Sequence, residues 1–134
     1  MNATAMKLDE FTRSYLETAL WSSTDDYERP MDENYTVDDI ALESIEEAIA
    51  DCDKFREEVK KRGYFDRMHE CGNDSDHGHN FWLTRHGHGA GFWDGDYNDS
   101  DEYGNSLGHE LTNICKEFIP LCPYAGDDGL IWFG

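Results

Sequence analysis

The longest regular pattern in the sequence is residues 36–63, TVDDIALESIEEAIADCDKFREEVKKRG, which predicts an amphipathic helix over residues 37–62. Thr36 is a suitable N-cap, Asp39 completes an approximate capping box, and Gly63 is a suitable C-terminal stop. One face of this helix is apolar: Leu42, Ile45, Ala48, Ile49, Cys52, Phe55 and Val59. The outer face is almost wholly acidic: Asp39, Glu43, Glu46, Glu47, Asp53 and Glu57.

Two further helices are expected on either side of this segment. Toward the N-terminus, residues 7–20 repeat apolar side chains at helical spacing: Leu8, Phe11, Tyr15 and Ala19. Toward the C-terminus, residues 106–118 offer another apolar face: Leu107, Leu111, Ile114, Cys115 and Phe118. The polar segments 22–34 and 68–78 are expected to be loops.

The remaining elements read as strands. Residues 81–85 alternate between two faces, residues 86–91 form a glycine-rich turn, and residues 91–94 return, so residues 80–94 predict a β-hairpin. A turn signal at Asp127, Asp128 and Gly129 precedes a short strand over residues 130–133. We therefore expect an α+β fold, with a small antiparallel sheet packed against two or three helices in one acidic domain, residues 1–134.

Charge excludes several classes of partner. The 134 residues include 30 Asp and Glu against 11 Lys and Arg, giving a formal net charge of −19. Nucleic acids and anionic membranes bind proteins through Lys and Arg, so neither is an expected direct partner. We find no signal-peptide pattern and no apolar run of about 20 residues, the length that spans a bilayer, so a cytosolic location is expected.

The cysteines suggest neither a disulfide framework nor a zinc ribbon. A reducing cytosol favours free thiols, and no two cysteines form the CxxC pair typical of structural zinc sites. The four cysteines are Cys52, Cys71, Cys115 and Cys122.

Two weak motifs could bind metal ions. His86 and His88 flank the glycine-rich turn and could supply two ligands, but their spacing matches no established zinc motif. Asp99, Asp101 and Glu110 occupy positions 1, 3 and 12 of an EF-hand loop, whereas position 5 is a tyrosine instead of Asp or Asn. Polar turns and a solvated loop explain both patterns without a metal, so we expect no metal and no cofactor.

The glycine-rich turn suggests an alternative function. It lacks the GK[ST] signature of a phosphate cradle, and no nucleophile motif such as GxSxG occurs, so an enzyme is not expected. Aromatic and histidine side chains around the turn could instead form a pocket for a small ligand, with or without a metal. The residues of this alternative site are Trp82, Arg85, His86, His88 and Trp93.

The acidic outer face of the long helix suggests the leading function. Side chains three and four residues apart lie about 5–6 Å from each other on a helix, and DNA also presents closely spaced negative charge. Such a surface can mimic DNA and occupy the basic groove of a nucleic-acid-binding protein. The expected partner-binding residues are Asp39, Glu43, Glu46, Glu47, Asp53, Glu57, Asp94, Asp96, Asp99, Asp101 and Glu102. The alternative is a protein that is merely acidic, as in a salt-adapted host.

Several blocks of the sequence resemble an uncharacterised family of small bacteriophage proteins. The most distinctive block is HNFWLTRHGHGAGFWD, from His79 to Asp94, and further blocks are ALWSSTDD at 19–26, DENYTVDDI at 32–40 and GDDGLI at 126–131. The resemblance implies a phage origin and action in the host bacterial cytoplasm, for example in host takeover or as an anti-defence inhibitor. A structural accessory role in the virion is a further alternative. The resemblance implies no catalytic residues.

Overall fold

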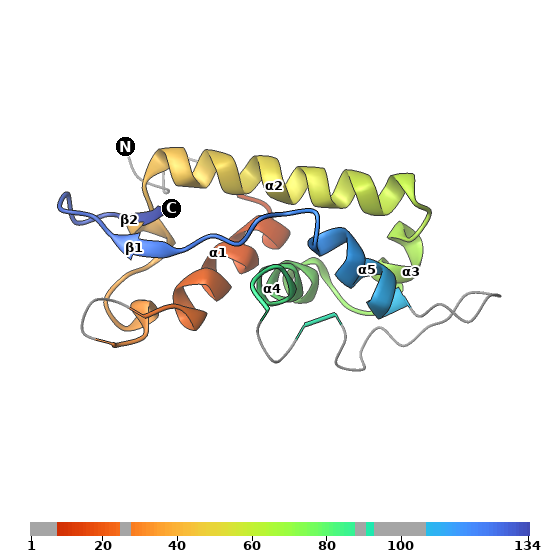
Figure 1. Cartoon of the computed structure of the whole chain (residues 1–134), viewed down its shortest axis with the longest axis horizontal. Coiled ribbons are helices and arrows are strands. Elements are labelled where there is room, and N and C mark those ends of the chain that lie inside the picture. The colour runs from red at the N-terminus through yellow and green to blue at the C-terminus, as the bar shows by residue number, and fades with distance from the viewer. Residues whose placement is uncertain (1–7, 25–27, 88–90, 93–106) are drawn as a thin grey trace.

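The computed structural model describes residues 8–24, 28–87, 91–92 and 107–134, and Figure 1 shows how their helices and strands are arranged. In chain order the described elements are α1 Glu10–Ser22, η2 Met31–Glu33, η3 Val37–Asp39, α2 Leu42–Lys61, α3 Phe65–Glu70, α4 Asp74–Arg85, α5 Leu107–Cys115, β1 Pro123–Ala125 and β2 Ile131–Phe133. These residues thus form five α-helices and a two-stranded antiparallel sheet, which confirms the α+β class.

The long helix is shorter at its start than its sequence suggests. Thr36 and Asp39 do form the expected capping box, but the box caps η3, a single turn of 3₁₀-helix. Ile40 is extended and pairs with Ile131, and the amide of Ala41 donates a 2.8 Å hydrogen bond to the Ile131 carbonyl. The predicted helix over 37–62 is therefore split, because the C-terminal strand holds the backbone between η3 and α2. α2 ends as expected near Gly63, whose φ is 83°.

The predicted hairpin over residues 80–94 is wrong, because its first half belongs to α4. Asn73 and Asp76 form a capping box that starts this helix inside the expected loop 68–78, which also overlaps α3. The five-residue alternation that suggested a strand is too short to exclude a helix, and the cap decides between them. Residues 91–92 form no strand, and residues 93–94 lie outside the described residues.

α4 packs directly on α1 because Gly78 has no side chain. A Cβ added at Gly78 would lie 2.0 Å from the carbonyl oxygen of Phe11, far inside van der Waals contact. The Ser14 hydroxyl donates a 2.6 Å hydrogen bond to the carbonyl of Ser75 and so joins the same two helices. The predicted first helix, residues 7–20, is confirmed as α1 at Glu10–Ser22, with Asp9 as its N-cap.

The sheet lies at one end of the molecule in Figure 1. β2 confirms the strand expected at residues 130–133, and its antiparallel partner is β1, with Tyr124 opposite Trp132. Asp128 accepts a 3.0 Å hydrogen bond from the amide of Leu130 in the intervening turn. β1 was not predicted, because it has only three residues and begins with Pro123, so no hydrophobic alternation marks it as a strand.

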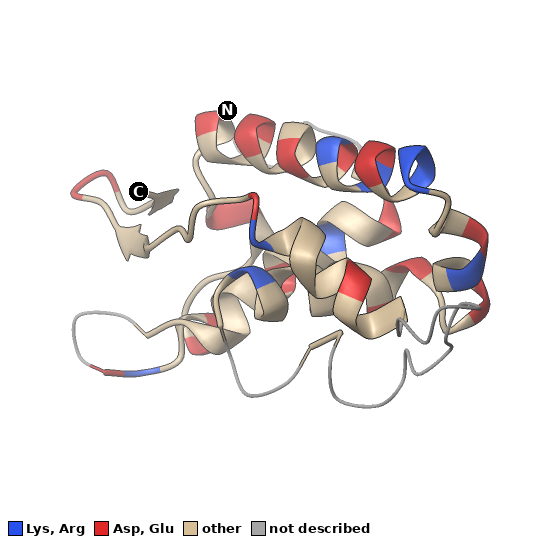
Figure 2. Ribbon diagram, turned by 45° about the vertical axis from the view of Figure 1, so that its right-hand side comes forward, with Lys and Arg blue, Asp and Glu red and all other residues tan. Residues whose placement is uncertain are grey.

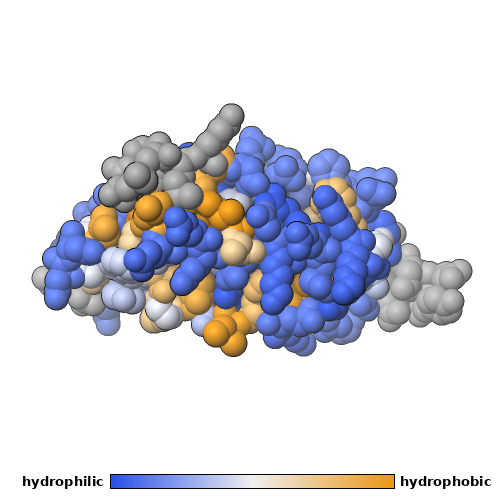
Figure 3. Space-filling model, turned by 90° about the horizontal axis from the view of Figure 1, so that it is seen from above, coloured by the Kyte–Doolittle hydropathy of each residue, from blue (hydrophilic) through white to orange (hydrophobic). Residues whose placement is uncertain are grey.

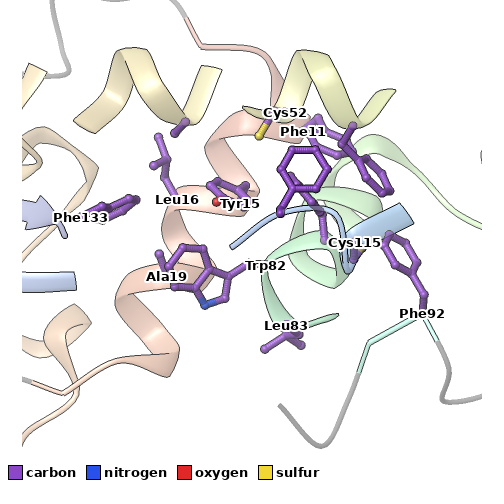
Figure 4. Packing of buried hydrophobic residues seen from close by; sticks show 14 of the residues in the cluster. Phe11, Tyr15, Leu16, Ala19, Cys52, Trp82, Leu83, Phe92, Cys115 and Phe133 are labelled. Atoms are coloured by element: carbon purple, nitrogen blue, oxygen red, sulfur yellow. The ribbon is translucent and has the colours of Figure 1, made fainter. Parts of the chain in front are cut away.

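One cluster of buried side chains joins all the described helices and β2. Its centre is aromatic: the rings of Phe55 and Phe81 stack with centroids 4.3 Å apart, and Tyr15 contacts Phe81. Tyr15 also lies against Trp82, as Figure 4 shows. Cys52 and Cys115 are buried in this core, and burial raises the pKa of both thiols. All four cysteines are free.

The third predicted helix, residues 106–118, is observed as α5, which ends at Cys115, while Phe118 remains buried beyond it. No helix within the described segments has both the length and the apolar character needed to cross a membrane.

Candidate functional site

The predicted acidic side chains of α2 do face outward. Glu43, Glu46, Glu47, Asp53 and Glu57 are exposed, whereas the carboxylate of Asp39 is partly buried and accepts a 2.8 Å hydrogen bond from the amide of Thr36. Figure 2 shows acidic turns along α2, joined by basic turns toward its C-terminal end. The predicted residues Asp94, Asp96, Asp99, Asp101 and Glu102 lie outside the described residues.

Negative charge is concentrated around the N-terminal half of α2. Residues 32–51 include eight Asp and Glu and no Lys or Arg, whereas residues 52–62 include three acidic and five basic residues. The seven carboxylates of residues 32–47 are called the acidic surface below: Asp32, Glu33, Asp38, Asp39, Glu43, Glu46 and Glu47. In the part of the chain that the structure describes, none of them forms an ion pair.

The C-terminal half of α2 has a different character. Asp53 forms a 2.7 Å ion pair with Arg56, which also binds Asp9 at 2.9 Å. Arg62 pairs with Glu58 at 3.2 Å and with Glu117 at 2.7 Å. In this half, ion pairs therefore offset part of the predicted acidic face, although Glu57 forms no ion pair among the described residues. The surface seen from the α2 side is largely hydrophilic (Figure 3).

The alternative site around the glycine-rich turn is used for packing where the structure describes it. Trp82 is only 1% exposed, its indole donates a 2.8 Å hydrogen bond to the hydroxyl of Ser22, and its ring stacks on His86 with centroids 3.7 Å apart. The amide of Leu121 donates to Nε2 of His86 at 2.9 Å, so Nδ1 carries the proton that bonds the Trp82 carbonyl at 2.8 Å. Both ring nitrogens of His86 are thus occupied.

Arg85, also predicted to bind a ligand, is a buried structural cation. Its Nη1 donates 2.8 Å hydrogen bonds to the carboxylate of Asp51 and to the hydroxyl of Tyr15, and its Nε donates to the carbonyl of Ile119 at 2.9 Å. Burial raises the pKa of Tyr15, so this hydroxyl stays protonated. His88 and Trp93 lie outside the described residues.

A pocket that the sequence analysis missed lies beside the acidic surface. It is about 580 Å³ in volume and is formed by α1, by the segment that contains η2 and η3, and by His79 in the middle of α4; we call it the α1 pocket. Its wall includes two aromatic side chains, three carboxylates, one guanidinium and one imidazole: Trp21, Tyr35, Glu17, Asp32, Asp38, Arg13 and His79. Two of its carboxylates, Asp32 and Asp38, belong to the acidic surface as well.

A hydrogen bond to Thr18 orients the imidazole of His79 in this pocket. Thr18 donates its single hydroxyl proton to the Ser14 carbonyl at 2.7 Å, so its 2.9 Å contact with Nδ1 of His79 requires a proton on Nδ1. The imidazole also contacts the indole of Trp21, with ring centroids 5.8 Å apart.

One sequence signal could have revealed part of this pocket. Trp21 lies outside the apolar spacing of Leu8, Phe11, Tyr15 and Ala19, which indicates an outward position for a large aromatic side chain. In the structure it is 57% exposed. Its pocket neighbours come from residues 13–21, 32–38 and 79, and no local pattern links those segments.

Neither of the suggested metal motifs is supported by the described residues, among which no group of three or more His, Cys, Asp or Glu could hold a metal ion. Most of the EF-hand-like loop and His88 are outside them. Comparisons with protein-family models, with curated proteins and with solved structures give no match for this chain. Its function therefore has to be argued from the charge and shape of the surface.

Proposed function

We propose that the protein binds a basic protein surface through its acidic surface and thereby mimics the backbone of a nucleic acid. The observation that supports this proposal is the run of carboxylates in residues 32–51, which contains no Lys or Arg and lies on η2, η3 and the start of α2. The target is a nucleic-acid-binding protein of a bacterial host, and the site of action is the host cytoplasm.

Electrostatics favours a basic partner over a merely solubilising role. Clustered like charges repel one another and reduce the stability of the folded chain, so a segment such as 32–51, with eight carboxylates and no Lys or Arg, is costly to keep. A basic groove would relieve that repulsion and release counterions, as it does when it binds nucleic acid. The complex then forms fast and weakens steeply with added salt, because the Debye length falls from about 10 Å at 0.1 M to about 3 Å at 1 M.

The test compares two variants with equal charge changes. Glu46→Lys with Glu47→Lys alters the acidic surface at exposed positions of α2. Asp66→Lys with Glu70→Lys makes the same change on α3, at the opposite end of α2 (Figure 1). Each protein is immobilised and exposed to bacterial lysate at low and high salt, and retained proteins are identified by mass spectrometry.

We expect the wild type and the α3 variant to retain the same basic protein at low salt and to release it at high salt. The α2 variant should retain little of it. Equal retention by all three proteins, or retention that is insensitive to salt, would reject the acidic surface as the binding site.

A further inference from the structure

We propose that the α1 pocket receives an arginine side chain of the partner, an inference that rests on the proposed function and names a specific contact within it. The pocket volume of about 580 Å³ exceeds that of one side chain and leaves room for flanking backbone. Glu17, Asp32 and Asp38 oppose the single charge of Arg13, so these four side chains of the wall carry a net charge of −2.

The aromatic wall distinguishes this pocket from a simple cluster of carboxylates. Trp21 exposes 57% of its surface although an indole gains free energy from burial. A cation placed over the face of a tryptophan ring is attracted by the ring quadrupole, and this attraction is strongest for Trp among the aromatic residues. Tyr35 provides a second aromatic side chain in the same wall.

The geometry favours arginine over lysine. A guanidinium is planar, so it can stack on an indole while its N–H groups donate to carboxylates at its edge, whereas an ammonium is a compact and strongly hydrated charge. The 2.9 Å contact between the Thr18 hydroxyl and Nδ1 of His79 orients the imidazole within the same wall. The contact between Trp21 and His79 and the bond from Ser14 to Ser75 brace this wall before any ligand arrives.

The probe is N-acetyl-arginine amide, titrated into the full chain while the indole N–H signals are followed by two-dimensional NMR. N-acetyl-citrulline amide has nearly the same shape without the charge and serves as the matched ligand control. The buried indole of Trp82 serves as the internal reference. The protein variants are Glu17→Gln and Trp21→Ala, both at exposed positions of α1, and the control Asp66→Lys with Glu70→Lys on α3.

We expect a saturable shift of the Trp21 signal in the millimolar range with the arginine compound, and an affinity about tenfold lower for citrulline or for Glu17→Gln, as for loss of one charged hydrogen bond. Trp21→Ala should abolish the shifts at neighbouring pocket amides. The α3 variant should bind the arginine compound within about twofold of the wild type, since its substitutions lie outside both the pocket wall and the acidic surface.

Absence of a saturable shift, or equal affinity for citrulline, would overturn this inference. Those results concern the pocket alone, because retention of the basic partner in the lysate experiment tests the acidic surface separately. Arginine binding without any retained partner would uphold the pocket and reject the proposed function.

Discussion

Arg85 places a positive charge in the interior, where three neighbours surround it. Its side chain is only 3% exposed, and it contacts Asp51 on α2, Tyr15 on α1 and the carbonyl of Ile119. A guanidinium suits this place because its several N–H groups point in fixed directions and can satisfy three acceptors together. The residue therefore joins three segments of the chain and is unavailable to a ligand.

Removing Arg85 should destabilise the protein strongly. Arg85→Leu keeps apolar bulk but leaves Tyr15 and Ile119 without their donor, so we expect a loss of about 2–4 kcal/mol in the free energy of unfolding. Asp51 is 31% exposed, and Asp51→Asn should cost about 1 kcal/mol because water can replace part of its contact. Urea unfolding of both variants measures the difference, and equal losses would contradict the structural role of Arg85.

His77 is a second single residue with a testable effect: it should make the free energy of unfolding depend on pH. Burial lowers its pKa below the ordinary value of 6.5, although Asp74 and Asp76 oppose this shift. Above pH 6.5 the ring is neutral in both states; below it the unfolded chain takes up the proton first, so the free energy of unfolding falls as pH falls. The decline should be smaller in His77→Gln when both proteins are unfolded in urea between about pH 7 and pH 5.5. Parallel curves would exclude this contribution.

At the scale of elements, α4 depends on its cap. The amide of Asp76 donates a 2.9 Å hydrogen bond to Oδ1 of Asn73, and the amide of Asn73 donates to Asp76 at 3.1 Å. We expect Asn73→Ala to lower the free energy of unfolding by about 1 kcal/mol, because an N-cap side chain satisfies an otherwise unpaired amide. Asn73→Asp should retain most of the stability. A neutral effect of the alanine variant in thermal unfolding would argue against this helix start.

Local patterns predicted the helices well and the sheet poorly. The heptad-like spacing of α2 and the apolar residues of α1 and α5 gave these elements within a few residues, because helix burial repeats within a single segment. α4 was missed because five alternating residues, 81–85, fit a strand as well as a helix, and its capping box lies in a segment read as loop. β1 was missed because its three residues form a strand only through hydrogen bonds to β2, which a local sequence pattern does not show.

The candidate sites were also predicted only where a local pattern defines them. The outward carboxylates of α2 follow from helical spacing, and their exposure agrees with that reading. Their partial neutralisation by Arg56 depends on distant Asp9 as well as on the neighbouring Asp53, so the sequence could show only part of it. The α1 pocket assembles residues up to 66 positions apart, between Arg13 and His79, and no spacing rule could predict it.

At the scale of the whole molecule, a net charge of −19 on 134 residues implies strong self-repulsion. We expect the melting temperature to rise as salt is added from about 0.01 M to about 0.5 M, because the Debye length shrinks and screens the repulsion between exposed carboxylates. Glu46→Lys with Glu47→Lys should melt higher than the wild type at low salt, and the two should converge at high salt. A melting temperature that falls with salt in calorimetry would contradict this view of the acidic surface.

The central claim is that the acidic surface takes the place of a nucleic acid. Its most direct test is fluorescence anisotropy of a labelled DNA duplex bound to the basic protein retained from lysate, with this chain added as competitor. We predict that the wild type displaces the duplex completely and that Glu46→Lys with Glu47→Lys does so at least about tenfold less well, consistent with the loss of charged contacts at a binding site. A ternary complex, in which the duplex and this chain occupy the basic protein together, would contradict the claim.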